Sequence, residues 1–272
     1  MKPHKFDYVR CDTVDEATEL LAQYGDAARI MAGGQSLMAM LNLRLLEPAV
    51  LIDISRIGAL SEIREVAGKV EVGAAVTQNR LLAWPGLKQK LPLLAAALPH
   101  VGHFQTRNKG TVCGSVAHAD PSSEIPLSLA TLEGEVVLRS RAGTRVLPAR
   151  EFQRGMLTTA RRPDELVTEV RFPVQTTRRV AFREMARRHG DFAIVAIAAV
   201  ANGGAVRLGV GGMAGQPATR DFAAGADLGD ALNALAWELE GYEDMHATSQ
   251  MRRDILRRMA PVVIEEALRC SE

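Results

Sequence analysis

Residues 28–55 read ARIMAGGQSLMAMLNLRLLEPAVLIDIS, and this stretch decides the fold. The short apolar run over residues 28–32 predicts a strand, and the two glycines that follow predict a turn. The apolar residues of 37–46 predict a helix that stops before a proline. Residues 50–54 are rich in β-branched side chains and predict a second, buried strand. The stretch therefore has the order strand, glycine turn, helix, strand.

The rest of the chain mixes helices with hairpins. Thr13 and Glu16 form a capping box that predicts a helix over residues 14–24. We expect further helices at 77–83, 91–101, 123–132, 228–239 and 249–268, strands or hairpins at 63–75, 135–147, 167–174, 180–186, 193–201 and 206–213, a linker at 175–179, and an irregular functional loop at 102–121. Frequent hairpins among irregularly alternating helices indicate an α+β fold.

Composition and charge exclude several classes of protein. The 272 residues include 33 basic and 32 acidic side chains, a formal net charge of +1, and 4% aromatic residues. The chain therefore lacks the excess of basic residues, and the aromatic residues for stacking on bases, that are typical of a nucleic-acid-binding protein. No run approaches the roughly 18 apolar residues that a membrane helix needs, and the N-terminal residues predict no signal peptide.

The three cysteines, Cys11, Cys113 and Cys270, are odd in number and far apart. This pattern argues against a disulfide scaffold and fits a reducing compartment. An iron–sulfur cluster usually takes about four closely spaced thiolates, so this chain alone cannot hold one. If the protein carries out redox chemistry, the electron carrier is something other than its own sulfur.

Two turns of small residues are candidates for binding phosphate. The first, residues 32–37 (AGGQSL), follows a predicted strand and opens a predicted helix, where glycines allow close approach and N–H groups can bind an anion. The second, residues 110–115 (GTVCGS), adds hydroxyl groups. Neither is the six-residue dinucleotide fingerprint, and each has the alternative of being a structural turn. Together the two turns can hold the two phosphates of a dinucleotide.

The polar residues around these turns also have structural explanations. Three histidines lack the spacing of a metal-ligand set and are expected to lie on the surface or in hydrogen bonds. They are His100, His103 and His118. Cys113 is expected to be a small buried residue rather than a reactive thiol. Three serines lack the nucleophile-elbow pattern, which argues against a hydrolase. They are Ser36, Ser115 and Ser123.

Four segments resemble the medium subunit of carbon monoxide dehydrogenase and its relatives. Residues 32–55 resemble the first FAD motif of that family, and QTRNKGTVCGSVAHADPSSE (105–124) resembles the second. RRHGDFAIV (187–195) resembles the start of the family's C-terminal domain, and GGAVRLGVGGMAGQPATR (203–220) fits it as well. The segments are long and occur in the expected order, and the wider family includes the flavin domain of xanthine dehydrogenase.

The resemblance implies the architecture. The expected fold is α+β, with an FAD-binding domain of the vanillyl-alcohol oxidase (PCMH) type at residues 1–176, divided into lobes at about 1–56 and 57–176. A C-terminal domain at 177–272, of the carbon monoxide dehydrogenase flavoprotein type, is expected to contain a three-stranded sheet and a helical bundle.

The resemblance also implies the residues that bind FAD. Two segments are expected to hold the pyrophosphate through main-chain N–H groups and the hydroxyls of two of their residues, Ser36 and Thr111. They are Ile30, Met31, Ala32, Gly33, Gly34, Gln35, Ser36 and Leu37, and Thr111, Val112, Cys113, Gly114 and Ser115. Glu124 corresponds to an acidic residue that bonds the ribityl chain. Further expected contacts are Val101, His118, Asp120, Val167, Arg183 and Phe192.

Two positions depart from the family pattern. Cys113 replaces the first residue of a glycine pair, and a cysteine cannot adopt a positive φ as cheaply as glycine. We still expect the turn to bind, because related subunits tolerate cysteine there. Phe192 stands where many relatives have a tyrosine against the flavin ring, so the hydrophobic cover is kept and a possible hydrogen bond is lost.

The resemblance implies an electron-transfer function without substrate catalysis in this chain. A molybdenum cofactor in a large partner subunit would oxidise the substrate, and two [2Fe–2S] clusters in a small partner would pass the electrons to FAD. The FAD would then reduce an external acceptor. The resemblance further implies a cytoplasmic heterotrimer, with a dimer of heterotrimers as an option, and no metal site in this chain. The alternatives are a free-standing FAD oxidase and a structural subunit that has lost its flavin. Scattered cysteines argue against the benzoyl-CoA reductase branch, whose flavin subunit carries an extra cluster.

Overall fold

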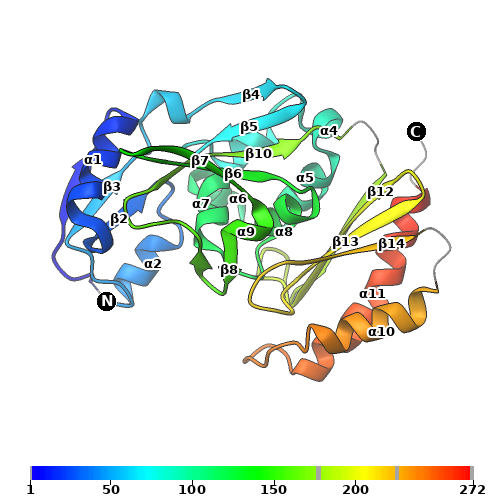
Figure 1. Cartoon of the computed structure of the whole chain (residues 1–272). Coiled ribbons are helices and arrows are strands. Elements are labelled where there is room, and N and C mark those ends of the chain that lie inside the picture. The colour runs from blue at the N-terminus through cyan, green and yellow to red at the C-terminus, as the bar shows by residue number, and fades with distance from the viewer. Residues whose placement is uncertain (1, 176–178, 224–226, 270–272) are drawn as a thin grey trace.

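The computed structural model describes residues 2–175, 179–223 and 227–269 (Figure 1). Cys270 and most of the predicted linker at 175–179 lie outside these ranges. The buried apolar residues form two clusters, one that spans the N-terminal lobes and a second within the C-terminal sheet and helices. No helix among the described residues is long and apolar enough to cross a membrane.

The first lobe is a small parallel sheet with one helix against it. Its elements are β1 (Asp7–Arg10), α1 (Val14–Tyr24), η1 (Gly25–Ala27), β2 (Ala28–Met31), α2 (Leu37–Asn42) and β3 (Val50–Asp53), and the short helix η2 (Gly58–Leu60) leads into the second lobe. The strand order is β1-β3-β2, and the central strand β3 is buried at every position, as its apolar sequence predicts. The glycine turn leaves the sheet at the carboxyl end of β2, where parallel sheets commonly bind ligands.

The capping box of α1 forms as predicted, whereas α2 is shorter than predicted. Thr13 Oγ1 accepts the Glu16 N–H at 3.1 Å, and the Glu16 carboxylate accepts the Asp12 N–H at 2.9 Å. The helix expected over residues 37–46 ends at Asn42. Arg44 has a φ of 56°, and a residue in the left-handed region ends a helix.

The second lobe is built on a five-stranded antiparallel sheet in the order β4-β5-β10-β6-β7. Its strands are β4 (Ile63–Val66), β5 (Lys69–Gly73), β6 (Glu135–Ser140), β7 (Gly143–Pro148) and β10 (Leu166–Pro173), with a separate small hairpin of β8 (Gln153–Gly155) and β9 (Thr158–Thr159). Its helices are α3 (Gln78–Leu82), α4 (Leu87–Lys90), α5 (Pro92–Ala97), η3 (Leu98–His100), α6 (Phe104–Lys109), α7 (Val112–His118), α8 (Glu124–Thr131) and α9 (Ala149–Phe152). The predicted hairpins at 63–75 and 135–147 are confirmed.

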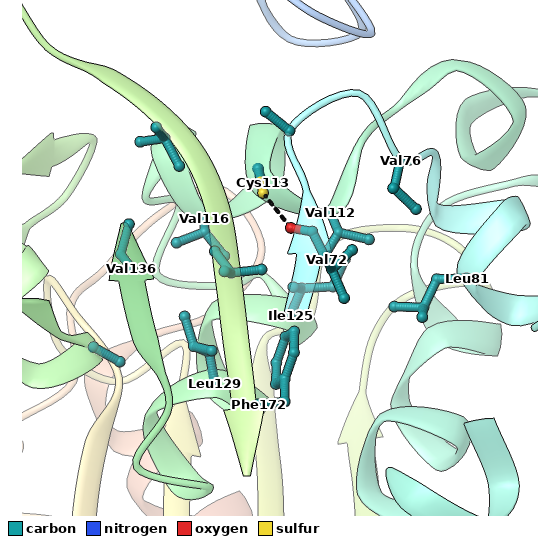
Figure 2. Packing of buried hydrophobic residues seen from close by; sticks show 14 of the residues in the cluster. Val72, Val76, Leu81, Val112, Cys113, Val116, Ile125, Leu129, Val136 and Phe172 are labelled. Carbon is teal, nitrogen blue, oxygen red and sulfur yellow. Dashed lines mark hydrogen bonds between the residues drawn. The ribbon is translucent and has the colours of Figure 1, made fainter. Parts of the chain in front are cut away.

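The prediction of an irregular loop at 102–121 was wrong, because the segment contains α6 and α7. The segment is dense in His, Asn, Thr and Gly, which favour turns and caps over helix interiors. Tertiary packing stabilises α7 instead. Figure 2 shows Val116 and Cys113 of this helix packed with Ile125 of α8 against the sheet residues Val72 and Phe172.

The C-terminal part is an antiparallel sheet of four strands rather than the three predicted, in the order β11-β12-β13-β14. Its elements are β11 (Val180–Met185), β12 (Val195–Asn202), β13 (Ala205–Gly211), β14 (Ala218–Ala223), α10 (Leu228–Glu238) and α11 (Ser249–Arg269). Gly203 and Gly204 have φ values of 55° and 92° and form the predicted hairpin turn. The missed strand β14 is an exposed edge strand with only Phe222 buried, so its sequence lacks a hydrophobic signal.

The C-terminal sheet lies between helices of both parts of the molecule. α11 packs on one face and α8 on the other (Figure 1). β12 is buried on both faces, with Ala196 and Ala198 in the N-terminal cluster and Val195, Ile197 and Ala199 in the C-terminal one. α8 also packs on α7, so it is buried at almost every position. It thereby connects α7 of the second lobe to the C-terminal sheet.

Candidate functional site

The two predicted turns meet backbone to backbone. A Cβ atom placed on Gly33 would lie 2.1 Å from the carbonyl oxygen of Lys109 and 2.8 Å from the Cα of Gly110. Only a residue without a side chain fits at this contact. The first turn belongs to the first lobe and the second turn to the second lobe, so the contact brings together two segments that are distant in the sequence.

The first turn presents a row of free hydrogen-bond donors. Within the described residues, no protein group accepts the main-chain N–H groups of 33–37, and the Met38 N–H donates to the Gly34 carbonyl at 3.0 Å. Gly34 has a φ of 70°, which turns the chain toward α2. Ser36 precedes α2 and makes no side-chain capping bond. Unpaired N–H groups and a hydroxyl at the start of a helix are suited to an anion.

Hydrogen bonds to α7 and α3 hold the second turn in place. Thr111 caps α7, because its Oγ1 accepts the Gly114 N–H at 2.9 Å. The Gln78 N–H donates to the Gly110 carbonyl at 2.8 Å and ties the turn to α3. The Thr111 hydroxyl keeps its own proton, which it can donate to a ligand.

Cys113 occupies a helical position rather than a strained one. It is the second residue of α7, and its side chain is buried with Sγ donating to the Val72 carbonyl at 3.3 Å (Figure 2). Burial raises the pKa of the thiol, which is therefore neutral. The prediction of a small buried residue is confirmed, whereas the concern about a positive φ was wrong, since helical φ suits cysteine.

The segment after α7 turns tightly into α8. Ala119 has a φ of 54°, and the Asp120 carboxylate accepts the Ser122 N–H at 2.8 Å, so Asp120 shapes the turn. His118 lies at the end of α7 and is partly buried. Burial lowers the pKa of His118 against the opposing charge of Asp120, which favours the neutral ring.

Glu124 is a buried carboxyl group at the start of α8. Burial and the nearby Glu184 raise its pKa to about 8, and its own N–H opposes this rise. The carboxyl is therefore largely protonated at neutral pH and can donate as well as accept a hydrogen bond. His100 Nδ1 lies 3.3 Å from the Glu184 carboxylate, and this bond raises the pKa of His100 despite partial burial.

A loop of the C-terminal sheet packs on residues 102–103, between η3 and α6. A Cβ atom on Gly190 (φ 85°) would lie 2.7 Å from the His103 ring and 2.9 Å from the Gly102 carbonyl oxygen. Phe192 follows two residues later, and 66% of its surface is exposed. The loop thus packs on residues 102–103 at Gly190 and carries an exposed aromatic ring two residues further on.

Arg183 and Val167 have partners that sequence reasoning did not anticipate. Arg183 Nε donates to the Glu266 carboxylate of α11 at 3.0 Å, whereas Glu184 faces His100. Successive strand residues point to opposite faces, so Arg183 points away from His100. Val167 is buried in β10 opposite Leu138 of β6.

Arg107 and Gln78 hold the segments around the second turn, and neither was among the predicted site residues. Arg107 donates to the carbonyls of Val101 at 2.9 Å and Gly102 at 2.8 Å, which fixes the turn before α6. The Gln78 Oε1 atom is buried without a hydrogen-bond partner, and a Cβ on Gly110 would lie 3.2 Å from it. Arg107 lies within residues 105–124, the segment that resembles the second FAD motif, and this position could have marked it as a site residue.

A separate groove of about 800 Å³ lies between β11 and α11. Met185, Met251 and Met259 line it together with His100. Neither residues 33–37 nor residues 110–115 contribute to this groove. The groove is therefore distinct from the contact between the two turns.

Comparison with known proteins assigns the chain to a family. Residues 4–175 match the model described as "FAD binding domain in molybdopterin dehydrogenase". The chain belongs to this family. It is 35% identical to the "6-hydroxypseudooxynicotine dehydrogenase complex subunit alpha" of Paenarthrobacter nicotinovorans, over 98% of this chain and 96% of that protein.

Solved structures of other members have the same fold over the whole length. A chain of quinoline 2-oxidoreductase from Pseudomonas putida 86 superposes with a TM-score of 0.89 at 34% identity, covering 98% of both chains. A chain of the Cu,Mo-CO dehydrogenase gives a TM-score of 0.90 at 30% identity, with 98% of this chain and 99% of that chain covered. This member of the FAD-binding family is an oxidoreductase subunit with an α+β fold.

The described residues fit FAD. Its diphosphate requires several N–H donors and close backbone approach, and the turn at 33–37 provides both. Its ribityl hydroxyls require a polar partner, and a buried, largely protonated carboxyl group such as that of Glu124 has the chemistry to be one. The close contact at Gly33 excludes side chains where the two turns meet.

Proposed function

We propose that this chain holds one FAD with its diphosphate at the contact between the two turns, and that it relays electrons within a molybdenum hydroxylase complex. The single observation that carries the proposal is the direct approach of Gly33 to Lys109 and Gly110, which joins the two phosphate-binding turns. The unpaired N–H groups of residues 33–37 support it, because they make an anion site without requiring any basic side chain.

Each part of the chain has a defined task in this proposal. The first turn donates its N–H groups to the diphosphate, and Thr111 adds its hydroxyl proton. Residues 30–32, 35–37 and 112–115 shape the two walls of the diphosphate site, with Val101 and Val167 as further contacts. His118 and Asp120 lie between the second turn and Glu124 in the sequence, and we assign them to the neighbourhood of the ring system.

Glu124 holds a proton on its buried carboxyl at neutral pH, so it donates a hydrogen bond to a ribityl hydroxyl at no cost in charge burial. Phe192 covers the ring from the loop that Gly190 fixes on His103. When bound, FAD supplies a carrier that accepts electrons singly and releases them singly or in pairs. Arg183 takes part only if its ion pair with Glu266 opens.

The partners in the proposal are a small subunit with two [2Fe–2S] clusters and a large subunit with the molybdopterin cofactor. The relatives support this, since one is named as a subunit of a dehydrogenase complex and others as medium chains of carbon monoxide dehydrogenase. We propose a heterotrimer, its dimer, and an external electron acceptor. Buried free thiols at Cys11 and Cys113 support a cytoplasmic location.

We also propose the domain boundaries. The FAD-binding domain occupies residues 1–176, in lobes of about 1–56 and 57–176, and the C-terminal domain occupies 177–272. The separate sheets, and a second apolar cluster made only of residues after 180, support this division.

Native mass spectrometry of the co-purified complex tests the function. We expect this chain together with one iron–sulfur subunit and one molybdopterin subunit, and a flavin absorption spectrum from the isolated chain. A yellow protein that purifies without partners and is reduced by a substrate of its own would indicate a free-standing FAD oxidase rather than an electron-transfer subunit. A colourless chain that takes up no FAD would overturn the proposal.

A further inference from the structure

Among the described residues, Arg252 of α11 is the largest fully buried side chain, at 1% exposure. Burying a guanidinium group is costly unless its donors and charge have partners. One of its terminal nitrogens donates to the carbonyls of Ile194 and of Gly212, the latter at 2.8 Å, and the other donates to the Asp244 carboxylate at 2.5 Å. A single side chain thus ties together three loops.

The first of these loops carries Phe192. Ile194 follows Phe192 by two residues, and its own N–H donates to the Met185 carbonyl at 2.7 Å, which closes the base of the loop. A Cβ atom on Gly212 would lie 2.4 Å from the Ile194 carbonyl oxygen, so the two chain segments touch at the point where Arg252 binds both. Arg252 thus binds the chain two residues after Phe192.

The same arginine reaches the FAD-binding motif through a tyrosine. Its guanidinium group stacks 4.1 Å from the centre of the Tyr242 ring, and the Tyr242 hydroxyl lies 3.2 Å from the Ser122 hydroxyl. Ser122 is two residues before Glu124. The Gly212 N–H also donates to the Pro121 carbonyl at 2.9 Å, so both routes end in the turn before α8.

We propose that Arg252 is a positioning residue that sets the Phe192 loop in register with the Ser122–Glu124 turn, and thereby fixes the surroundings of the flavin. This inference rests on the proposed FAD site. The planar guanidinium group is required, because its two terminal nitrogens bind the Ile194 carbonyl and the Asp244 carboxylate separately. Lysine has a single side-chain nitrogen and cannot hold both partners in this arrangement.

The chain provides matched variants. Arg252→Lys keeps the charge and removes the planar guanidinium group, and Tyr242→Phe removes only the hydroxyl that meets Ser122. The control is Arg253→Lys, because Arg253 is the next residue of α11, stacks 4.4 Å from the centre of the Trp237 ring, and donates to the Glu240 carbonyl. Far-UV circular dichroism confirms that each full-length variant is folded.

The first measurement is limited trypsin cleavage after Arg187 and Arg188, which lie in the Phe192 loop, and it needs no flavin. We expect at least a 10-fold faster cleavage there in Arg252→Lys and less than a 2-fold change in Arg253→Lys. Equal cleavage rates in wild type and Arg252→Lys would overturn the positioning of the loop.

The second measurement is the visible circular dichroism and midpoint potential of FAD bound to the full chain. A purely structural role would leave both unchanged in variants that bind FAD. We expect Arg252→Lys to change the sign or to halve the intensity of the flavin bands and to shift the potential, and Tyr242→Phe to do so to a smaller degree. Spectra and potentials equal to wild type in both variants would overturn the inference, and if Arg252→Lys does not fold, Tyr242→Phe alone decides.

The outcome also separates the two proposals. A wild-type chain that binds no FAD overturns the proposed function and the flavin part of this inference together. A wild-type chain that binds FAD, with variants that behave identically, overturns the role of Arg252 alone.

Discussion

The two turns at the site differ in what holds them. The turn at 33–37 is open, since its N–H groups have no partner within the described residues, and Gly33 is where it packs closely on the other turn. The turn at 110–115 is locked, because Thr111 caps α7, Gln78 binds Gly110, and Cys113 is buried in the core. The difference indicates that the two turns have different roles. The first supplies main-chain N–H donors, and the second supplies a rigid surface beside them.

Gly33→Ala should have the largest effect on FAD affinity, because it disrupts the contact between the open and the locked turn. The new methyl group meets the Lys109 carbonyl, and neither backbone can yield without moving a lobe. We expect a loss of about 3 kcal/mol in the free energy of unfolding and at least a 100-fold weaker FAD affinity. Urea denaturation and fluorescence titration measure the two, and wild-type affinity would show that the turns do not share the ligand.

Glu124→Gln should change the pH dependence of stability. The pKa of Glu124 is raised from 4.5 to about 8 in the folded chain, so the native state binds more protons than the unfolded state between these values. Stability therefore falls as pH rises through that window, by up to about 4 kcal/mol, and the glutamine removes the fall.

Urea denaturation of the flavin-free chain at pH 5 and pH 8.5 measures this effect. His100, whose pKa is raised by its bond to Glu184, adds its own pH dependence, so the comparison is between variant and wild type. We expect Glu124→Gln to be the more stable protein at pH 8.5. Equal slopes for the two proteins would mean that Glu124 is ionised in the folded state.

Gly34→Ala tests the open turn alone. Its φ of 70° costs a residue with a side chain about 1–2 kcal/mol, although the nearest atom to the new Cβ is a flexible methionine carbon at 3.4 Å. Gly68→Ala is the control, because Gly68 has a φ of 76° with nothing within 4 Å, in the hairpin of β4 and β5. Both variants should lose similar stability, and only Gly34→Ala should bind FAD more weakly. Equal FAD affinity in the two variants would show that the first turn does not bind FAD.

Thr111→Ala tests the locked turn and should have the smallest effect, about 1 kcal/mol of stability from the lost cap. Thr13→Ala is the control, since Thr13 caps α1 through the same type of bond. Thr111→Ala should also weaken FAD binding several-fold, and Thr111→Ser should restore most of it. If serine does not restore binding, the hydroxyl is not a ligand.

The sequence predicted elements that local chemistry determines. The helix capped by Thr13, the hairpin turned by Gly203 and Gly204, and the buried strand at Val50–Asp53 each depend on neighbours in the chain. The helices α6 and α7 were missed because long-range packing stabilises them. Cys113, for example, is helical since its side chain reaches Val72 of β5.

The composition of the two turns was visible in the sequence, whereas their contact was not. Nothing in the residues around Gly33 or Gly110 indicates that they touch, because the approach depends on how two lobes fold around their sheets. Arg252 was overlooked for a related reason. A basic residue in an amphipathic helix is normally exposed, and only the tertiary structure reveals three loops that converge on it.

Competition calorimetry tests the central claim, which is that the joined turns bind the diphosphate of FAD. FAD is titrated into the purified full-length chain alone, then in the presence of ADP, and then in the presence of riboflavin. The account predicts one FAD per chain, with strong competition from ADP and little from riboflavin, because ADP carries the diphosphate and riboflavin does not. Strong competition from riboflavin with none from ADP, or no binding of FAD at all, would contradict it.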